Sequence, residues 1–297
     1  MTVEDSEKFI EYVYEKSFSL NHLMNRSQEL TEVTHFAIKK ASDELLGNGQ
    51  LGKFNLPILG EILFPFTSFG KTSSISLLNF HELCLFKIYS LISKNYSTAL
   101  DLGANIGLHS IVMSKAGFEK IIAVEADINH FERFDTNLSI NNVNNVDFKN
   151  IAVSDKSGFV RFTRVLDNLT GSHIYGSKEK IYGELAEITV ESKPITEFLV
   201  HGQKTFIKMD IESHESIAIS QISKSFWSDI DMCLEIGNLQ NAKNIYDYCK
   251  INKLFMFSQK FDWNVIENVE QLPKHWKDGS VFISSNLHFI DEILQEI

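Results

Sequence analysis

The chain has 297 residues, 43% hydrophobic and 23% charged, which excludes a disordered protein and allows one sizeable core. Its net charge of −11 excludes a generic duplex-DNA-binding protein, because such binding needs a basic surface, so we expect no nucleic-acid partner. The cysteines Cys84, Cys233 and Cys249 lack CxxC or zinc spacing and are typical of free thiols in a reducing cytoplasm.

The sequence shows no pattern of a secreted or membrane-spanning chain. Its N-terminus is acidic and lacks the apolar core of a signal peptide. The most apolar window, residues 54–69, is interrupted by Pro57, Gly60, Glu61 and Pro65, which argues against a transmembrane helix. We therefore expect a cytoplasmic protein without a transmembrane segment.

The first third of the chain has a helical pattern. Apolar side chains recur at three- and four-residue spacing over residues 3–46, which predicts a helix that stops at Gly47. Residues 50–78 predict short strands and turns, and residues 79–94 predict a second amphipathic helix. Because this part shows no recognisable reaction centre, we interpret residues 1–95 as a helical cap or oligomerisation region. Its amphipathic helix favours a homodimer.

From residue 96 the pattern changes to alternating strands and helices. Strands are predicted at Ser97–Leu102, Lys120–Glu125, Val146–Val153, Thr205–Ile211, Asp231–Ile236, Leu254–Phe257 and Ser280–Ser284. Helices are predicted at Leu108–Ala116, Asn129–Asn141, Glu215–Ser223 and Asn241–Ile251. The third and fourth strands are separated by the strand-like runs GFVRFTRV and EITVES, with a polar loop between them. This alternation indicates a parallel sheet with helices on both faces, so residues 96–297 are predicted to form one α/β domain.

A glycine-containing turn follows the first of these strands. In the segment TALDLGANIG, residues 98–107, Gly103 allows a sharp turn and Gly107 allows the next helix to pack closely. Glu125 follows Gly107 by 18 residues, where an acidic residue can accept hydrogen bonds from both ribose hydroxyls. The segment therefore predicts a nucleoside-binding turn at the carboxyl end of a buried strand.

The spacing alone fits both a nicotinamide dinucleotide and a methyl donor. Leu108 stands directly after Gly107, so the third glycine of the GxGxxG pattern is absent. Asp101 precedes the turn, where a carboxylate would repel a pyrophosphate and meet a cationic ligand such as the amino-acid end of S-adenosylmethionine. Both details favour the methyl donor.

Four segments in order, DLGANIGLHS, VEADINHFERFDTNLSINN, NIAVSDKSG and IKMDIESHE, resemble the FkbM-type S-adenosylmethionine-dependent methyltransferases. The resemblance covers roughly residues 55–290 and implies a Rossmann-like, seven-stranded methyltransferase fold. It also implies cofactor-binding positions: Asp101, Gly103, Asn105 and Gly107 for the methionine moiety, Glu125 for the ribose, and Ala126, Asn150 and Ala152 beside the adenine. One departure concerns a turn, because the family commonly has Glu-Gly where this chain has Glu212-Ser213.

Acidic side chains gather after the fourth and fifth strands. Asp210 and Glu212 share one side of an extended chain, and Glu235 and Asn238 follow the next strand. Carboxylate and amide oxygens can bind a hard divalent ion such as Mg²⁺ or Mn²⁺. The arrangement is similar to that of catechol-type O-methyltransferases and predicts a metal site. The alternative is that Glu212 only begins the next helix, whose positive end favours acidic residues.

Methyl transfer to a hydroxyl needs a group that accepts the proton. The histidine candidates are His109, His173 and His214, and we rank His214 first because it adjoins the acidic cluster. His173 comes next, and Asp210, which faces the predicted mouth, completes the catalytic set. A structural hydrogen bond is the competing interpretation for each histidine.

The polar loop over residues 168–183 suits a hydroxyl-rich or phosphate-bearing substrate. It offers Ser172, Lys178, Lys180 and Tyr182 beside the expected site, although a solvated surface loop would have a similar composition. FkbM-like proteins include sugar O-methyltransferases of antibiotic and surface-polysaccharide pathways. The resemblance therefore implies a sugar acceptor, in particular a nucleotide-activated sugar.

Two other functions remain open from the sequence. One is a nicotinamide-dependent oxidoreductase, and the other is a non-catalytic module that uses a methyltransferase-like fold for assembly. Retention of Asp101, Glu125 and Asp210 together argues against a chain that has lost its chemistry. The sequence does not distinguish O-methylation from N-methylation.

Overall fold

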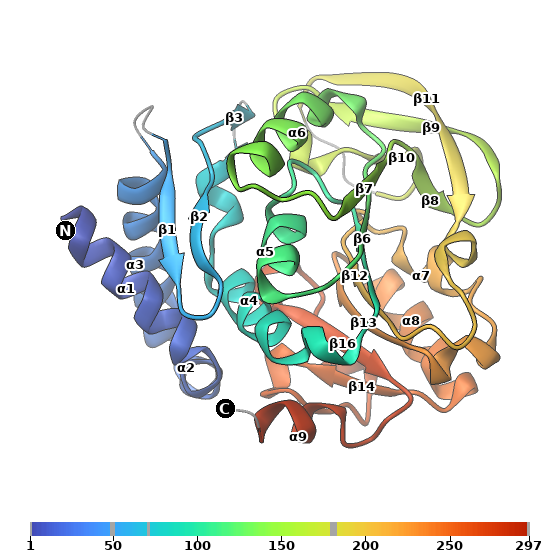
Figure 1. Cartoon of the computed structure of the whole chain (residues 1–297). Coiled ribbons are helices and arrows are strands. Elements are labelled where there is room, and N and C mark those ends of the chain that lie inside the picture. Colours follow the sequence, from blue (N-terminus) through green and yellow to red (C-terminus); the bar gives the residue numbers. More distant parts are fainter. Residues whose placement is uncertain (1, 48–50, 70–71, 179–182, 296–297) are drawn as a thin grey trace.

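The computed structural model describes residues 2–47, 51–69, 72–178 and 183–295 (Figure 1). Two residues of the predicted substrate loop, Lys180 and Tyr182, lie outside these ranges. Within the described ranges, no helix is both long and apolar enough to cross a bilayer.

The N-terminal helical region consists of three helices, so the single helix predicted over residues 3–46 is wrong. They are α1 (Val3–Glu15), α2 (Ser17–Met24) and α3 (Gln28–Leu46). The last break is stabilised locally, because Ser27 Oγ accepts a hydrogen bond from the amide of Leu30 at the start of α3. A hairpin of β1 (Lys53–Leu56) and β2 (Gly60–Leu63) follows, then β3 (Ser68–Phe69), β4 (Thr72–Ser73) and α4 (Phe80–Ile92).

The main sheet has the order β15-β14-β16-β13-β12-β5-β6-β7. Its parallel strands are β5 (Thr98–Leu102), β6 (Ile121–Val124), β7 (Val146–Lys149), β12 (Thr205–Met209) and β13 (Ile230–Glu235). The mixed edge contains β14 (Phe255–Ser258), β15 (Asn264–Val265) and β16 (Ser280–Ser284), with β16 antiparallel to both β13 and β14. The predicted α/β architecture is confirmed. In the described part of the chain, the sheet holds the seven expected strands and the two-residue β15.

Alternating side chains of the central strands point to opposite faces, and each face is buried. On one face Ala99, Phe206 and Phe282 join a hydrophobic cluster with α4 and α5 (Leu108–Ala116). On the other face the central strands pack against residues of α7 (Glu215–Ile219) and α8 (Leu239–Asn252). Figure 1 shows these two helical layers on either side of the sheet, with α6 (Phe131–Ile140) and α9 (Phe289–Leu294) at its margins. Such a doubly covered parallel sheet explains the continuous apolar runs of its strands.

A second, smaller sheet has the order β10-β9-β11-β8. It consists of β8 (Ala152–Ser154), β9 (Gly158–Val165), β10 (His173–Ile174) and β11 (Leu185–Pro194). The strand predicted at Val146–Val153 is wrong in its continuity, because the chain leaves the main sheet after Lys149 and enters the small sheet at Ala152. The small sheet thereby stands beside the carboxyl ends of the main strands.

The first hydrophobic cluster runs from the N-terminal helices to the main sheet without interruption. It contains Ile10 of α1, Ile38 of α3 and Leu83 of α4 together with Ala99 of β5 and Ile121 of β6. The described residues of the 1–95 region therefore pack directly on the α/β sheet. Their division from residues 96–297 as a separate cap domain stays a prediction.

His81 lies in the first turn of α4, and we expect it to make the stability of the protein depend on pH. Burial lowers the pKa of His81 from 6.5 to about 4, so the folded state resists a protonation that the unfolded chain accepts. The contribution of neutral His81 to the free energy of unfolding is fully present above pH 6.5. It is lost as the pH falls toward 4, and the loss is about 3 kcal/mol at most. Urea unfolding of His81→Leu from pH 7 to pH 4 should show a smaller loss than wild type. His288→Gln, at an exposed site, should follow wild type, and equal losses in all three proteins would contradict this.

Candidate active site

The site lies where the strand order of the main sheet reverses. From β5 the chain proceeds outward through β6 and β7, and then returns to β12 on the other side of β5. Ligands of open α/β sheets bind at the carboxyl ends of strands at such a point. A cavity of about 950 Å³ occupies this position, lined by the ends of β5, β6, β12 and β13, by the start of α4 and by the small sheet.

The turn after β5 takes a conformation that glycine favours. Gly103 has φ +80°, and a Cβ atom there would lie 1.8 Å from the carbonyl oxygen of Asp210. Gly107 has φ +91°, and its Cβ would lie 3.0 Å from the Phe134 ring. Asn105 is left-handed as well, with φ +49°. Of these, Gly103 and Asn105 line the cavity, so the predicted turn borders the space where a cofactor would lie.

Glu125 follows β6 and anchors this turn. Its carboxylate accepts hydrogen bonds from the amides of Asn105 (2.9 Å) and Asp127 (2.8 Å). Burial disfavours its charge, but His130 and these two amides outweigh burial and hold the pKa of Glu125 below its ordinary value. Glu125 lines the cavity as a carboxylate, which is the form that accepts hydrogen bonds from ribose hydroxyls.

Of the three residues predicted beside the adenine, two line the cavity and the third supports the cavity wall from behind. Ala126 and Ala152 line the cavity, whereas Asn150 does not. The side-chain amide of Asn150 donates to the carbonyl oxygens of Glu125 (2.9 Å) and Ala126 (3.0 Å), so it holds the wall in place. Asp101 lies behind the cavity and is fully buried, with Ser110 Oγ donating to its Oδ2 at 2.6 Å.

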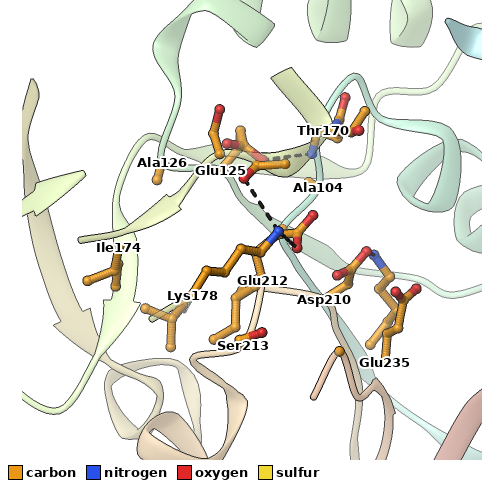
Figure 2. Close-up of a pocket in the computed structure, with 18 of the residues that line it drawn as sticks. Ala104, Glu125, Ala126, Thr170, Ile174, Lys178, Asp210, Glu212, Ser213 and Glu235 are labelled. Atoms are coloured by element: carbon orange, nitrogen blue, oxygen red, sulfur yellow. Dashed lines mark hydrogen bonds and ion pairs between the residues drawn. The ribbon is translucent and has the colours of Figure 1, made fainter. Parts of the chain in front are cut away.

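The end of the cavity at β12 and β13 is rich in carboxylates. Figure 2 shows Asp210 and Glu235 on the side of the cavity away from Ala126, with Glu212 and Lys178 on the Ala126 side of Asp210. Lys178, from the polar loop, forms an ion pair with Glu212. Burial raises the pKa of Glu212 to about 7, and burial together with the charge of Asp210 raises the pKa of Glu235 well above its ordinary value.

The four predicted metal ligands do not form a metal site in this arrangement. Asp210 faces Lys208, Glu212 pairs with Lys178, and Asn238 Oδ1 accepts the amide hydrogen of Asn241 at the start of α8. Across the described ranges, no group of three or more histidine, cysteine, aspartate or glutamate side chains is placed to hold a metal ion. The chain's own ammonium groups occupy the positions beside these carboxylates.

The two preferred histidines lie off the cavity wall. His214 is buried, with Nε2 3.2 Å from Ser154 Oγ and Nδ1 2.8 Å from Ser177 Oγ. His173 is buried too, with Nδ1 3.0 Å from the carbonyl oxygen of Gly171. Burial lowers the pKa of both rings. Asp210, by contrast, lines the cavity.

Two residues that the sequence analysis did not single out for the site, Glu82 and Lys208, also line it, as does His109, the third histidine candidate. Glu82, from α4, has Oε2 2.9 Å from Nε2 of His109, whose Nδ1 lies 3.0 Å from Tyr89 Oη. Lys208 stands inside the otherwise apolar strand β12. A lysine inside an apolar strand is the one sequence signal that could have revealed this group, because lysine is almost never buried without a partner.

The turn after Asp210 keeps its shape without a glycine. Glu212 and Ser213 have φ +59° and +76°, and the Glu215 carboxylate accepts the amides of Ile211 (2.9 Å) and Ser213 (3.3 Å). These hydrogen bonds hold the turn in a conformation that costs a non-glycine residue free energy.

Ser213→Gly is therefore expected to raise the free energy of unfolding by about 1 kcal/mol, because glycine adopts positive φ without strain. Chemical denaturation measures the change. The matched control is Ser216→Gly in α7, which should lower stability by about 1 kcal/mol, since glycine weakens helices. A loss at position 213 as large as that at position 216 would show that the turn is not strained.

The family model of the methyltransferase FkbM domain matches residues 101–276, more than half of the chain. The chain belongs to the FkbM methyltransferase family. It is an S-adenosylmethionine-dependent methyltransferase. This membership favours a methyl donor over the nicotinamide cofactor considered from the sequence. No curated protein sequence matches this FkbM-family chain.

Several solved methyltransferase structures are similar to this FkbM-family chain at low identity. A precorrin-6y C5,15-methyltransferase from Geobacter metallireducens has 12% identity and a TM-score of 0.38, covering 68% of this chain and 85% of its own. An rRNA methylase from Streptococcus thermophilus has 8% identity and a TM-score of 0.36, and the match covers 67% of this chain and 93% of the methylase. The N-terminal domain of human METTL16, in complex with S-adenosylhomocysteine, has 10% identity and a TM-score of 0.36, and the match covers 69% of this chain and 70% of that domain.

Proposed function

We propose that the protein transfers the methyl group of S-adenosylmethionine to a hydroxyl of a sugar, in particular a nucleotide-activated sugar used for surface polysaccharide. The observation that carries the proposal is the polarity of the cavity end at Asp210 and Glu235, where the acceptor would bind. Hydroxyl, amide and carboxylate side chains line this end, namely Asp210, Glu212, Ser213, Glu235, Asn238 and Gln240. Groups of this kind exchange hydrogen bonds with sugar hydroxyls.

A nucleic-acid acceptor fits this site less well. Bases that enter an active site are usually held by stacking on aromatic rings. Among the cavity-lining residues in the described part of the chain, Phe162 is the one phenylalanine, tyrosine or tryptophan, and it belongs to the small sheet. The net charge of −11 also opposes a polyanion.

Each group of cavity residues has a separate role in the proposed reaction. Glu125 would hold the ribose, with Ala126 and Ala152 beside the adenine, and the Gly103–Gly107 turn would admit the methionine moiety. The sulfonium methyl would then face Asp210, whose carboxylate takes the proton of the acceptor hydroxyl as the oxygen attacks. The base roles predicted for His214 and His173 stay predictions, because both rings contact other protein groups and neither histidine lines the cavity.

Assistance by Mg²⁺ or Mn²⁺ has no step in this mechanism. Its predicted ligands contact Lys208, Lys178 and the start of α8, as described above. We expect activity to survive exhaustive chelation and to be unchanged by added magnesium or manganese. A methyl-transfer assay before and after chelation measures this, and activity that disappears and returns with either metal would restore the metal site.

The experiment that tests the function uses S-adenosylmethionine labelled in its methyl group and a panel of nucleotide sugars. The expected product is a methoxyl group on a sugar carbon, found by mass spectrometry and NMR. Asp210→Asn is the matched control, since it should bind S-adenosylhomocysteine normally and transfer the methyl group about 10²-fold more slowly. Label on nitrogen or carbon, or label on RNA with none on sugars, would overturn the proposal.

Three broader expectations belong to the proposal and stay predictions. A cytoplasmic location would give the enzyme access to nucleotide sugars and to S-adenosylmethionine. A homodimer would cover exposed apolar residues of the N-terminal helices, such as Val33 and Phe36 of α3. Residues 1–95 would then act as a cap, because Glu82 and Asn79 from this region line the cavity.

A further inference from the structure

Lys208 lies on β12, the strand between β5 and β13 at the centre of the site. It pairs in register with Asp101, the residue before the glycine turn, and it lies two positions before Asp210 on the same side of β12. The residue is 6% exposed, yet its side chain lines the cavity. Its charge therefore stands at the bottom of the space where cofactor and acceptor meet.

The ammonium group of Lys208 is surrounded by carboxylates but not hydrogen-bonded by them. Nζ lies 3.8 Å from Asp101 Oδ1 and 3.9 Å from Asp210 Oδ2, beyond hydrogen-bonding distance. Burial disfavours its charge, but Asp210, Asp101, Glu82 and Glu235 outweigh burial and raise the pKa of Lys208, so it stays protonated. A buried ammonium needs hydrogen-bond acceptors, and this one presents donors to the cavity.

The position of these neighbours indicates which ligand the ammonium contacts. Asp210 and Glu235 stand at the ends of β12 and β13, on the acceptor side, whereas Glu125, directly after β6, marks the cofactor side. An ammonium next to the residue that takes the acceptor's proton lies where the acceptor oxygen develops negative charge. Hydrogen-bond donors placed at such a point stabilise a transition state.

We propose that Lys208 donates a hydrogen bond to the acceptor oxygen during methyl transfer. The inference rests on the proposed function. The acceptor hydroxyl loses its proton to Asp210, its oxygen forms the bond to the methyl carbon, and the carbon–sulfur bond breaks. The electron pair of that bond stays on sulfur, which becomes the neutral thioether of S-adenosylhomocysteine. Lys208 remains protonated throughout and supplies the positive charge that a metal ion would otherwise supply.

The test compares Lys208→Met and Lys208→Arg in the full chain. We expect Lys208→Met to lower kcat by about 10²-fold or more, because one donor to a developing oxyanion is lost. Its Kd for S-adenosylhomocysteine, measured by calorimetry, should change by less than about threefold, since cofactor binding does not use this group. Lys208→Arg, which keeps a cationic donor, should recover part of kcat. Lys204→Met, at an exposed site just before β12, should leave kcat unchanged.

A second readout separates stabilisation of the oxygen from structural support. A deoxyfluoro acceptor carries a fluorine next to the hydroxyl and makes that hydroxyl more acidic. It should raise the activity of Lys208→Met by a larger factor than the activity of wild type. Equal effects on both enzymes would assign Lys208 a structural role. If Lys208→Met does not fold, Lys208→Gln, which keeps a neutral donor, carries the same comparison.

The outcomes also separate this inference from the function on which it rests. An unchanged kcat in Lys208→Met, or a Kd for S-adenosylhomocysteine raised tenfold or more with kcat intact, would overturn the role of Lys208 alone. The second result would place Lys208 on the methionine carboxylate of the cofactor. If wild type methylates no oxygen, the proposed function fails and the role of Lys208 fails with it.

Discussion

Gly103→Ala is expected to abolish binding of S-adenosylhomocysteine and to lower the free energy of unfolding by about 3 kcal/mol. Two costs add at this position. A non-glycine residue at φ +80° is strained by about 1–2 kcal/mol. The new Cβ would also lie 1.8 Å from the Asp210 carbonyl oxygen, so β5 and β12 must separate, at a cost typical of overpacking, about 1–3 kcal/mol.

Gly202→Ala provides the matched control for that experiment. Gly202 has φ +77°, and a Cβ there would meet no atom within 4 Å. It isolates the backbone strain, and we expect a loss of about 1 kcal/mol with cofactor binding intact. Calorimetry and chemical denaturation of both variants give the comparison. Equal losses would show that close contact between the glycine turn and Asp210 does not build the site.

Arg164→Met is expected to lower the free energy of unfolding by about 3–5 kcal/mol. Arg164, on β9, donates two hydrogen bonds to Asp127, which is fully buried next to Glu125. Removing the guanidinium leaves this carboxylate buried without its countercharge. Because the Asp127 amide donates to Glu125, affinity for S-adenosylhomocysteine should fall as well.

Two comparisons make the Arg164 result specific. Arg161→Met, three residues earlier on the same strand, removes an exposed arginine 3.6 Å from Glu187 and should cost no more than about 1 kcal/mol. The double variant Asp127→Asn/Arg164→Met removes both charges and should recover part of the loss. If Arg164→Met proves as stable as Arg161→Met, the small sheet is not anchored through the Arg164–Asp127 pair.

The regular elements of the α/β region could be predicted from the sequence because their patterns are local. Leu108–Ala116 and Ser280–Ser284 match α5 and β16 in both bounds, and most other strands differ by one or two residues. The long N-terminal helix and the Val146–Val153 strand were wrong, since periodicity does not reveal a short break. At Asn150 the break depends on hydrogen bonds to the end of β6.

The candidate site was less predictable because it depends on contacts between distant segments. The glycine turn and Glu125 belong to one pattern along the chain, and both line the cavity. His214 instead faces Ser177 of the polar loop, and Lys208 is surrounded by carboxylates from four segments. Glu82 comes from α4, which carries no recognisable motif. Such side-chain directions are set by tertiary packing rather than by spacing along the chain.

The most direct test of the central claim is a crystal structure of the protein with S-adenosylhomocysteine. We expect the ribose hydroxyls on the Glu125 carboxylate, the adenine between Ala126 and Ala152, and the sulfur atom facing Asp210 and Lys208. S-adenosylhomocysteine bound outside this cavity, or bound with its sulfur turned away from Asp210, would contradict the account.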